Sequence, residues 1–261
     1  MLSRLAAAVV PALGRLAVTA DIPRVPEGGA VIVANHTSLA DPLVVLAALR
    51  RMGIEPVVLC AAGLWRIPLL GRALTREGYV PVRRGTARAA EALTGAEAAL
   101  RAGRYVLVYG EGCIPDRPDS ADAPPQAFRS GPARLAAAAG VPLVPLGQAG
   151  ARRITSGGAT KQLAGLLTAP LRRPRLHVHI GAPPRLPADT ASATQVARQS
   201  VTHAWRTAAD RRAEEPAARP LSTGRDDRPS GGWTAPPLDR PAAGTSRPWR
   251  RARRRRCSAR A

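Results

Sequence analysis

A histidine and an aspartate stand five residues apart in the stretch VIVANHTSLADP, residues 31–42, of a chain that has four histidines. The apolar, β-branched run before Asn35 and His36 predicts a buried strand, and Asp41-Pro42 predicts the start of a helix. Side chains five residues apart on one helix diverge by about 140°. Across a strand-loop-helix turn they can converge, so we expect His36 and Asp41 to meet there.

Such a pair is suited to base catalysis. A carboxylate that accepts a hydrogen bond from one imidazole nitrogen fixes the ring tautomer and leaves the other nitrogen as a base. It also stabilises the imidazolium that forms when the base takes a proton. The sequence has no Gly-x-Ser-x-Gly elbow, so the nucleophile can belong to the substrate. Asp41 also has a simpler interpretation, as the N-cap of the helix that follows.

The elements around this turn alternate between strand and helix patterns. Repeated βα units whose strands are apolar on both faces predict an α/β domain with a mainly parallel or mixed sheet flanked by helices. In such sheets ligands bind beyond the carboxyl ends of the strands. The expected strands are 30–34, 56–61, 79–82, 105–109, 141–146 and 175–181, and the expected helices are 42–52, a helix from Thr86 closed by Gly103, 133–139 and 194–213, with helix and turn signals over 64–78.

The first 20 residues predict an amphipathic helix. Its apolar side chains fall within one arc of a helical wheel, with two arginines opposite. This pattern fits a helix in a membrane interface and equally a helix packed on the domain's own core. Pro11 and the arginines argue against a membrane span. The arc consists of Leu2, Leu5, Val9, Leu13 and Leu16, and the arginines are Arg4 and Arg15.

Composition divides the rest of the chain into two parts. The formal charge is +21, and 12 Arg against 3 Asp after residue 216 leave +12 on residues 1–216. With six Pro and four Gly, residues 217–261 predict a disordered basic tail behind a domain over 21–216. A basic surface favours phosphates, acidic lipids or nucleic acids as partners. The three cysteines share no pair spacing, which argues against a disulfide framework or a zinc finger.

The stretch NHTSLAD resembles the Asn-His-x4-Asp signature of the glycerophospholipid acyltransferase family, which includes 1-acylglycerol-3-phosphate acyltransferases. Further blocks follow in the family's order, and the resemblance covers roughly residues 25–185. Four blocks in order on a matching βα frame are much more specific than a single His-x4-Asp. The other blocks are LLGRALTREGYVPVRRG (69–85), VYGEGCIP (108–115) and VPLVPL (141–146), and FRSGPARLA (128–136) also resembles the family's stretch between the third and fourth blocks.

The resemblance implies an O-acyltransferase. His36 takes a proton from a hydroxyl of the acceptor while Asp41 orients the ring, and the oxygen attacks the thioester of an acyl-CoA or an acyl carrier protein. Backbone N–H groups at the start of the 42–52 helix are the expected oxyanion donors. No metal or cofactor is expected. The implied acceptor is a lysophospholipid, most simply 1-acylglycerol-3-phosphate, at the cytoplasmic face of the membrane, where the enzyme binds peripherally.

The family blocks also imply residues that bind the substrate. Asn35 belongs to the signature, Arg84 stands where the family engages the acceptor's phosphate, and Glu111 and Gly112 are expected to shape the acceptor site.

The third block departs from the family pattern, since Gly110, Cys113, Ile114 and Pro115 replace Pro, Thr, Arg and Ser. Losing the Arg removes a bidentate contact to an anionic headgroup. Arg83, Arg84 and Arg117 are the nearest candidates to replace it.

Three other interpretations remain open on the residues alone. Cys113, in a Gly-flanked loop after a strand, could be a nucleophile with His36 as its partner. The net charge and the Arg-rich tail could indicate nucleic-acid binding, but few aromatics and no recognition motif accompany them. His177 and His179 fall on one face of a strand. Since no Cys or acidic residue lies near them in sequence, we assign no metal there.

Overall fold

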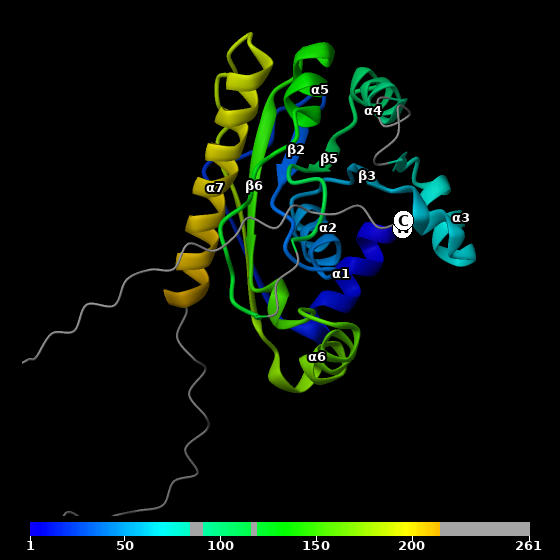
Figure 1. Cartoon of the computed structure of the whole chain (residues 1–261), viewed down its shortest axis with the longest axis vertical. Coiled ribbons are helices and arrows are strands. Elements are labelled where there is room, and N and C mark those ends of the chain that lie inside the picture. The colour runs from blue at the N-terminus through cyan, green and yellow to red at the C-terminus, as the bar shows by residue number, and fades with distance from the viewer. Residues whose placement is uncertain (84–90, 116–118, 215–261) are drawn as a thin grey trace, which may run out of the picture. The chain divides into compact units, whose positions relative to one another are not determined.

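The computed structural model describes residues 1–83, 91–115 and 119–214. They form one seven-stranded sheet in the order β1-β7-β6-β2-β5-β3-β4 (Figure 1). All neighbouring strands are parallel except β6 and β7, so the prediction of a mainly parallel or mixed sheet is confirmed.

The elements follow one another in βα order. In chain order they are α1 (Leu2–Leu13), β1 (Arg15–Ala20), β2 (Val31–Ala34), α2 (Asp41–Arg51), β3 (Val57–Ala61), η1 (Ala62–Arg66), α3 (Pro68–Arg76), β4 (Val80–Val82), α4 (Glu91–Arg101), β5 (Val106–Tyr109), α5 (Gly131–Ala139), β6 (Leu143–Ala149), η3 (Ala151–Arg153), α6 (Ala159–Arg172), β7 (Arg175–Ile180) and α7 (Thr190–Glu214).

Two apolar layers enclose the sheet because successive strand residues point to opposite faces. Ile32 packs with α1 and α2 on one face, whereas Val31 and Val33 pack with α4, α5 and α7 on the other. Figure 1 shows α7 running along β6. At Gly147 a Cβ would lie 2.1 Å from the backbone of Ala204 in α7, so only glycine permits this close approach.

The prediction of one helix over residues 1–20 is wrong. α1 ends at Leu13, and Arg15–Ala20 forms β1, which pairs in parallel with β7. α1 buries Ala6 and Val10 in the core that it shares with α2. The interpretation as a helix packed on the domain's own core is therefore confirmed, and the expected boundary after residue 20 divides what is one sheet domain.

The other predicted strands and helices are present with small shifts of their ends. Sequence patterns missed α6, a helix that follows the fourth family block. Thr86 and residues 217–261 lie outside the described residues. Across the described ranges, no helix combines the length and apolar character needed to cross a membrane.

Candidate active site

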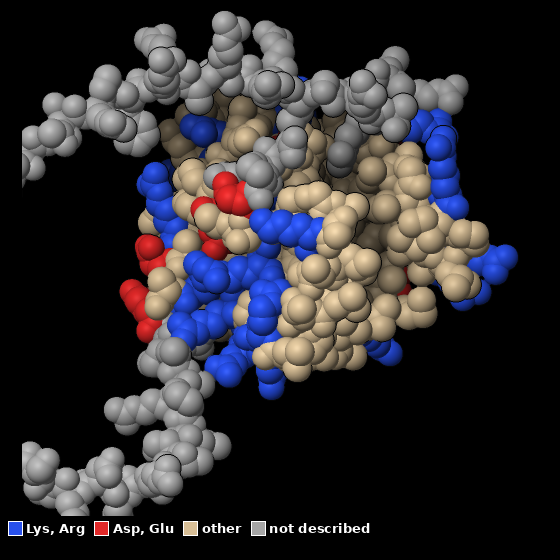
Figure 2. Space-filling model, turned by 60° about the horizontal axis from the view of Figure 1, so that its bottom comes forward, with Lys and Arg blue, Asp and Glu red and all other residues tan. Residues whose placement is uncertain are grey.

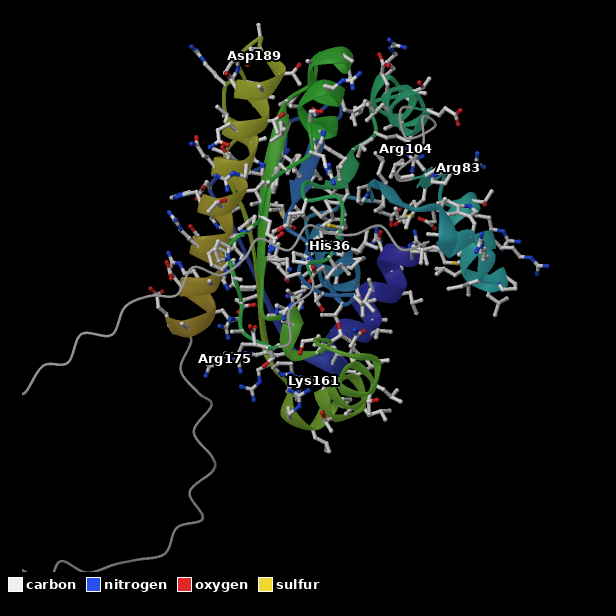
Figure 3. The ribbon with its side chains drawn as sticks, viewed as in Figure 1. His36, Arg83, Arg104, Lys161, Arg175 and Asp189 are labelled. Carbon is white, nitrogen blue, oxygen red and sulfur yellow. The ribbon has the colours of Figure 1, made fainter. Side chains whose placement is uncertain are left out.

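The polar residues of the first and third blocks meet at the carboxyl edge of the sheet. Ala34, the last residue of β2, lies beside Tyr109, the last residue of β5, and the N–H of Gly110 donates to the carbonyl of Ala34 (3.1 Å). β2 and β5 are parallel, so the residues after both strands face the same edge. His36 lies there, near the centre of the view in Figure 3.

His36 and Asp41 meet as predicted. Nδ1 of His36 donates to Oδ2 of Asp41 at 2.9 Å. The same oxygen accepts from the backbone N–H groups of Thr37 (2.5 Å) and Ser38 (2.8 Å). The interpretation of Asp41 as an N-cap is wrong, because Ala40 takes that position and the carboxylate points back over the turn. Three donors thus fix a carboxylate that has no exposure to solvent.

The ring nitrogen of His36 that does not bond Asp41 is Nε2. The side chain keeps 11% of its exposure, and no described residue hydrogen-bonds to Nε2. The ring stacks on Tyr109, with centroids 4.3 Å apart and planes 26° from parallel. Burial, and next the charge of Asp41, raise the pKa of Tyr109, so its hydroxyl stays neutral against the ring. Asp41 thus holds the edge of the imidazole at Nδ1, and Tyr109 packs on one face of the ring.

Glu111 acts as a clamp on the backbone and not as an open acceptor-binding group. Its Oε2 accepts from the N–H of His36 (2.5 Å) and its Oε1 from the N–H of Gln126 (2.9 Å). The side chain is buried, and both oxygens are in use. Its expected contact with the substrate is therefore replaced by a positioning role. Burial raises the pKa of Glu111 to about 7, although the two N–H donors act in the opposite direction.

The raised pKa of Glu111 predicts that the protein loses stability as the pH rises. The unfolded chain releases this proton near the ordinary glutamate pKa of 4.5, whereas the folded chain keeps it to about 7. The free energy of unfolding should therefore fall between these pH values, by an amount on the order of a few kcal/mol. Denaturant titrations from pH 4.5 to 8 measure this fall.

Glu111→Gln should flatten the decline because the amide does not titrate. Glu27→Gln, on an exposed carboxyl, should leave it unchanged. Parallel curves for wild type and Glu111→Gln would mean that Glu111 titrates at its ordinary pKa.

Asn35 joins β2 to β6. Its Nδ2 donates to the carbonyl of Gln148 (3.1 Å) and its Oδ1 accepts from the N–H of Gln148 (2.8 Å). Asn35 has no exposure, so its expected contact with the substrate is replaced by this structural role. The Gln148 side chain donates in turn to Oγ1 of Thr37 (3.2 Å), which lies in the turn between His36 and Asp41.

A second group of residues anchors the turn and was missed from the sequence. Ser38 Oγ donates to the carbonyl of Thr155 (2.8 Å) and lies 2.6 Å from its Oγ1. Buried Arg152 donates to the carbonyl of Thr37 (2.8 Å) and to that of Asp119. The available signal was the run of polar residues that follows an apolar strand, the same signal that pointed to His36.

The turn before α2 uses several of its backbone N–H groups within the protein. The N–H groups of His36, Thr37 and Ser38 all donate to buried carboxylates. The N–H of Ala40 donates to Ser38 and Thr155 side chains, and Pro42 has none. The turn uses these N–H groups to hold its shape, whereas the oxyanion donors expected at the start of the 42–52 helix stay a prediction.

Packing accounts for one departure in the third block. A Cβ on Gly110 would lie 2.3 Å from the ring of Phe128, so proline does not fit there. Gly112 has φ +72 and lies under the side chain of Arg129, whose Cγ would be 3.2 Å from a Cβ. Gly112 therefore shapes the loop through its backbone. Arg129 is an exposed cation on this loop that sequence reasoning did not select.

The expected anion-binding arginines are only partly described. Arg84 and Arg117 lie outside the described residues, and Arg83 is exposed after β4. Cys113 is half-buried, and the described partners of His36 are Asp41, Glu111 and Tyr109. The structure thus brings His36 together with Asp41.

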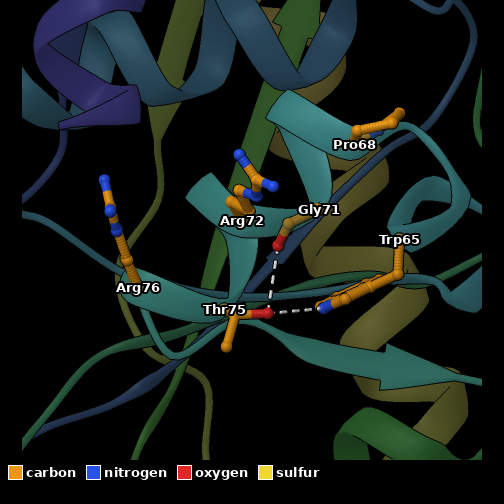
Figure 4. A pocket seen from close by; sticks show the side chains of 6 residues that line it. All are labelled: Trp65, Pro68, Gly71, Arg72, Thr75 and Arg76. Carbon is orange, nitrogen blue, oxygen red and sulfur yellow. Dashed lines mark hydrogen bonds between the residues drawn. The ribbon is translucent and has the colours of Figure 1, made fainter.

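Other polar groups lie apart from this cluster. A hollow of about 430 Å³ on α3 is lined by Trp65, Arg72 and Arg76 among others, and none of its lining residues belongs to the cluster around His36 (Figure 4). His177 and His179 share one face of β7, as predicted, and both bond Thr19 Oγ1 (3.0 and 2.9 Å). Among the described residues, no group of three or more His, Cys, Asp or Glu is placed to hold a metal.

Comparisons with known proteins agree with this geometry. A family model described as acyltransferase matches residues 15–148. The crystal structure of the 1-acyl-sn-glycerophosphate (LPA) acyltransferase, PlsC, from Thermotoga maritima is similar at a TM-score of 0.62, with 17% identity, over 83% of this chain and 80% of that chain. No curated protein matches the sequence. The structural similarity shows a shared fold.

Proposed function

The chain belongs to the acyltransferase family, and we propose that it transfers a fatty acyl group from an acyl thioester to a hydroxyl of a lysophospholipid. The observation that carries this proposal is the His36–Asp41 pair, with Nδ1 of the ring held at 2.9 Å from a fully buried carboxylate. The acceptor that the family and the similar fold favour is 1-acylglycerol-3-phosphate.

The mechanism follows from the protonation of the ring. Asp41 accepts from Nδ1, so Nε2 carries the lone pair. Nε2 takes the proton of the acceptor's hydroxyl while its oxygen attacks the thioester carbonyl. The tetrahedral oxyanion collapses, the C–S bond breaks, and the thiol leaves with the proton returned from His36. This scheme needs no cofactor beyond the acyl-CoA or acyl carrier protein thioester, and no metal.

The acceptor's negative headgroup requires cations near the third block. Ile114 stands where the family has an Arg. We propose Arg84 from the second block, together with Arg129, whose stem covers Gly112, as replacements. An arginine fork binds phosphate oxygens bidentately. Because the acceptor is a membrane lipid, we place the enzyme peripherally at the cytoplasmic face of the membrane.

A direct acyl transfer predicts that the Cys113 thiol is dispensable. Cys113→Ser should keep turnover within a few-fold of wild type, because the nucleophile belongs to the acceptor. Incubation with acyl thioester alone, followed by intact-protein mass spectrometry, should show no acyl adduct. A stable acyl-enzyme in wild type that disappears in Cys113→Ser would support the covalent scheme instead.

The substrates are identified by a screen. Purified enzyme is incubated with a set of lysolipid acceptors and mixed acyl thioesters, and the products are resolved by mass spectrometry beside His36→Ala. We expect a diacyl product from 1-acylglycerol-3-phosphate in wild type alone. Absence of any acyl product with all acceptors would refute the proposed function.

A further inference from the structure

Among the described residues, one helix buries very little of its surface against the rest of the domain. α6 (Ala159–Arg172) buries only Ala169. At Gly165 a Cβ would lie 2.4 Å from the carbonyl of Ile154, so α6 touches the domain through its smallest residues. Gly165 and Ala169 are one turn apart and define its inner face. The outer face of a 14-residue helix is thus left open.

The outer face is a row of leucines. Of nine exposed large apolar side chains in the described residues, four are on α6, with exposures of 41–87%. Their spacing i, i+3, i+4 and i+8 places them in one arc. Isolated exposed apolar residues are ordinary, but a contiguous set marks an interaction site. The leucine face consists of Leu163, Leu166, Leu167 and Leu171.

The charged residues at the two ends of α6 have one sign. Lys161 stands in the first turn of α6, and Arg172 and Arg173, which donate to the carbonyls of Gly165 and Pro11, follow at its end. The sequence has no Asp or Glu between Asp122 and Asp189. On the face of the molecule that Figure 2 brings forward, Lys and Arg side chains gather beside a broad uncharged surface. This surface is complementary to an apolar layer beneath negative charges.

We propose that the leucine face of α6 docks the enzyme on an anionic phospholipid bilayer. Leucines can enter the acyl region while the cations at both ends of the helix meet the headgroups. A second copy of the chain would bring these cations against one another. Residues 217–261 carry 12 Arg against 3 Asp, so charge disfavours them as well as a second copy as the occupant of the leucine face. The bilayer fits both the apolar and the charged part of the surface.

The same surface adjoins the catalytic turn. The segment before α6 holds the turn through Thr155, whose carbonyl accepts from Ser38 Oγ (2.8 Å) and whose Oγ1 accepts from the N–H of Ala40 (3.1 Å). Leu39, which lies between Ser38 and Ala40, is 63% exposed. Figure 3 shows Lys161 and Arg175 below His36, at the end of the molecule that carries α6. A bilayer bound to α6 would therefore present its lipids beside His36. This part of the inference rests on the proposed function.

Vesicle flotation of the full-length protein tests the docking surface without turnover. Vesicles of phosphatidylcholine, with or without about a third of phosphatidylglycerol, are used at low salt and at 0.5 M salt. High salt screens purely electrostatic binding by the Arg-rich terminal residues. We expect wild type to float with anionic vesicles at both salts, and Leu166→Ser/Leu167→Ser/Leu171→Ser to bind at least tenfold more weakly at high salt. Binding by this variant equal to wild type would overturn the proposal.

Matched variants and a second assay separate the alternatives. Leu69→Ser, at an exposed leucine on α3, should bind like wild type, and Lys161→Glu/Arg172→Glu/Arg173→Glu should bind anionic vesicles more weakly than wild type at low salt. If light scattering showed a dimer for wild type and a monomer for the leucine variant, the face would bind a second copy, and the proposal would be overturned.

Activity on a soluble short-chain acceptor separates docking from chemistry. The leucine variant should keep its activity on the soluble acceptor and lose its activity on the vesicle-bound acceptor. His36→Ala should float with vesicles like wild type but show no turnover. If wild type floated with vesicles but showed no acyl transfer, the proposed function would be refuted and the docking surface would stand.

Discussion

Replacing His36 with alanine should lower the turnover of acyl transfer by at least 10²-fold, and by as much as 10⁴-fold. The imidazole is the only described base whose second nitrogen is held by a buried carboxylate, at 2.9 Å. Without it, the acceptor's hydroxyl must lose its proton to water. The measurement is kcat with saturating acceptor and acyl thioester.

The fold should survive this change because the ring does not hold the turn. The backbone N–H of His36 still donates to Glu111, and Asp41 still accepts from Thr37 and Ser38. An unchanged far-ultraviolet spectrum and a similar melting temperature check this. His203→Ala, at an exposed histidine on α7, is the matched control and should be fully active. Near-normal turnover in purified His36→Ala would exclude His36 as the base.

Asp41→Asn should lower kcat by about 10²- to 10⁴-fold while KM changes little. The N–H groups of Thr37 and Ser38 donate to Oδ2 and therefore keep the amide oxygen at that position. The ring keeps its hydrogen on Nδ1, but the negative charge that stabilises the imidazolium is lost. The loss falls on kcat because the substrates do not contact a side chain that is fully buried.

Nitrogen NMR of the imidazole distinguishes this effect from a change of tautomer. Wild type and Asp41→Asn should both show the hydrogen on Nδ1. Asp210→Asn, at an exposed carboxyl on α7, should alter neither kcat nor the tautomer. If Asp41→Asn carried its hydrogen on Nε2, the wrong tautomer and not the lost charge would explain the lower kcat.

The architecture and the approach of His36 to Asp41 could be predicted from local sequence. Apolar, β-branched runs such as Val31–Ala34 specify buried strands wherever they occur, and their alternation with helices specifies a mainly parallel sheet. His36 and Asp41 lie within one turn, so their approach depends only on a strand ending and a helix beginning between them. Family blocks in order added the chemistry.

The roles of Asn35 and Glu111 were decided by tertiary structure. Sequence places both at a ligand-facing edge, but only the pairing of β2 with β6 and β5 shows which backbone groups they bind. Buried N–H and C=O groups must find partners. At this edge the buried backbone groups hydrogen-bond to Asn35 and Glu111, the polar side chains that sequence alone would assign to substrate binding.

The two ends of the fold show the same division. Residues 15–20 read as part of an apolar helical arc, and only pairing with β7, more than 150 residues away, makes them a strand. α6 lacks the buried stripe that identifies a helix, since Ala169 alone is buried. Local sequence determines patterns of burial and turn, whereas contacts between distant segments determine which polar groups remain open to ligands and which apolar faces remain uncovered.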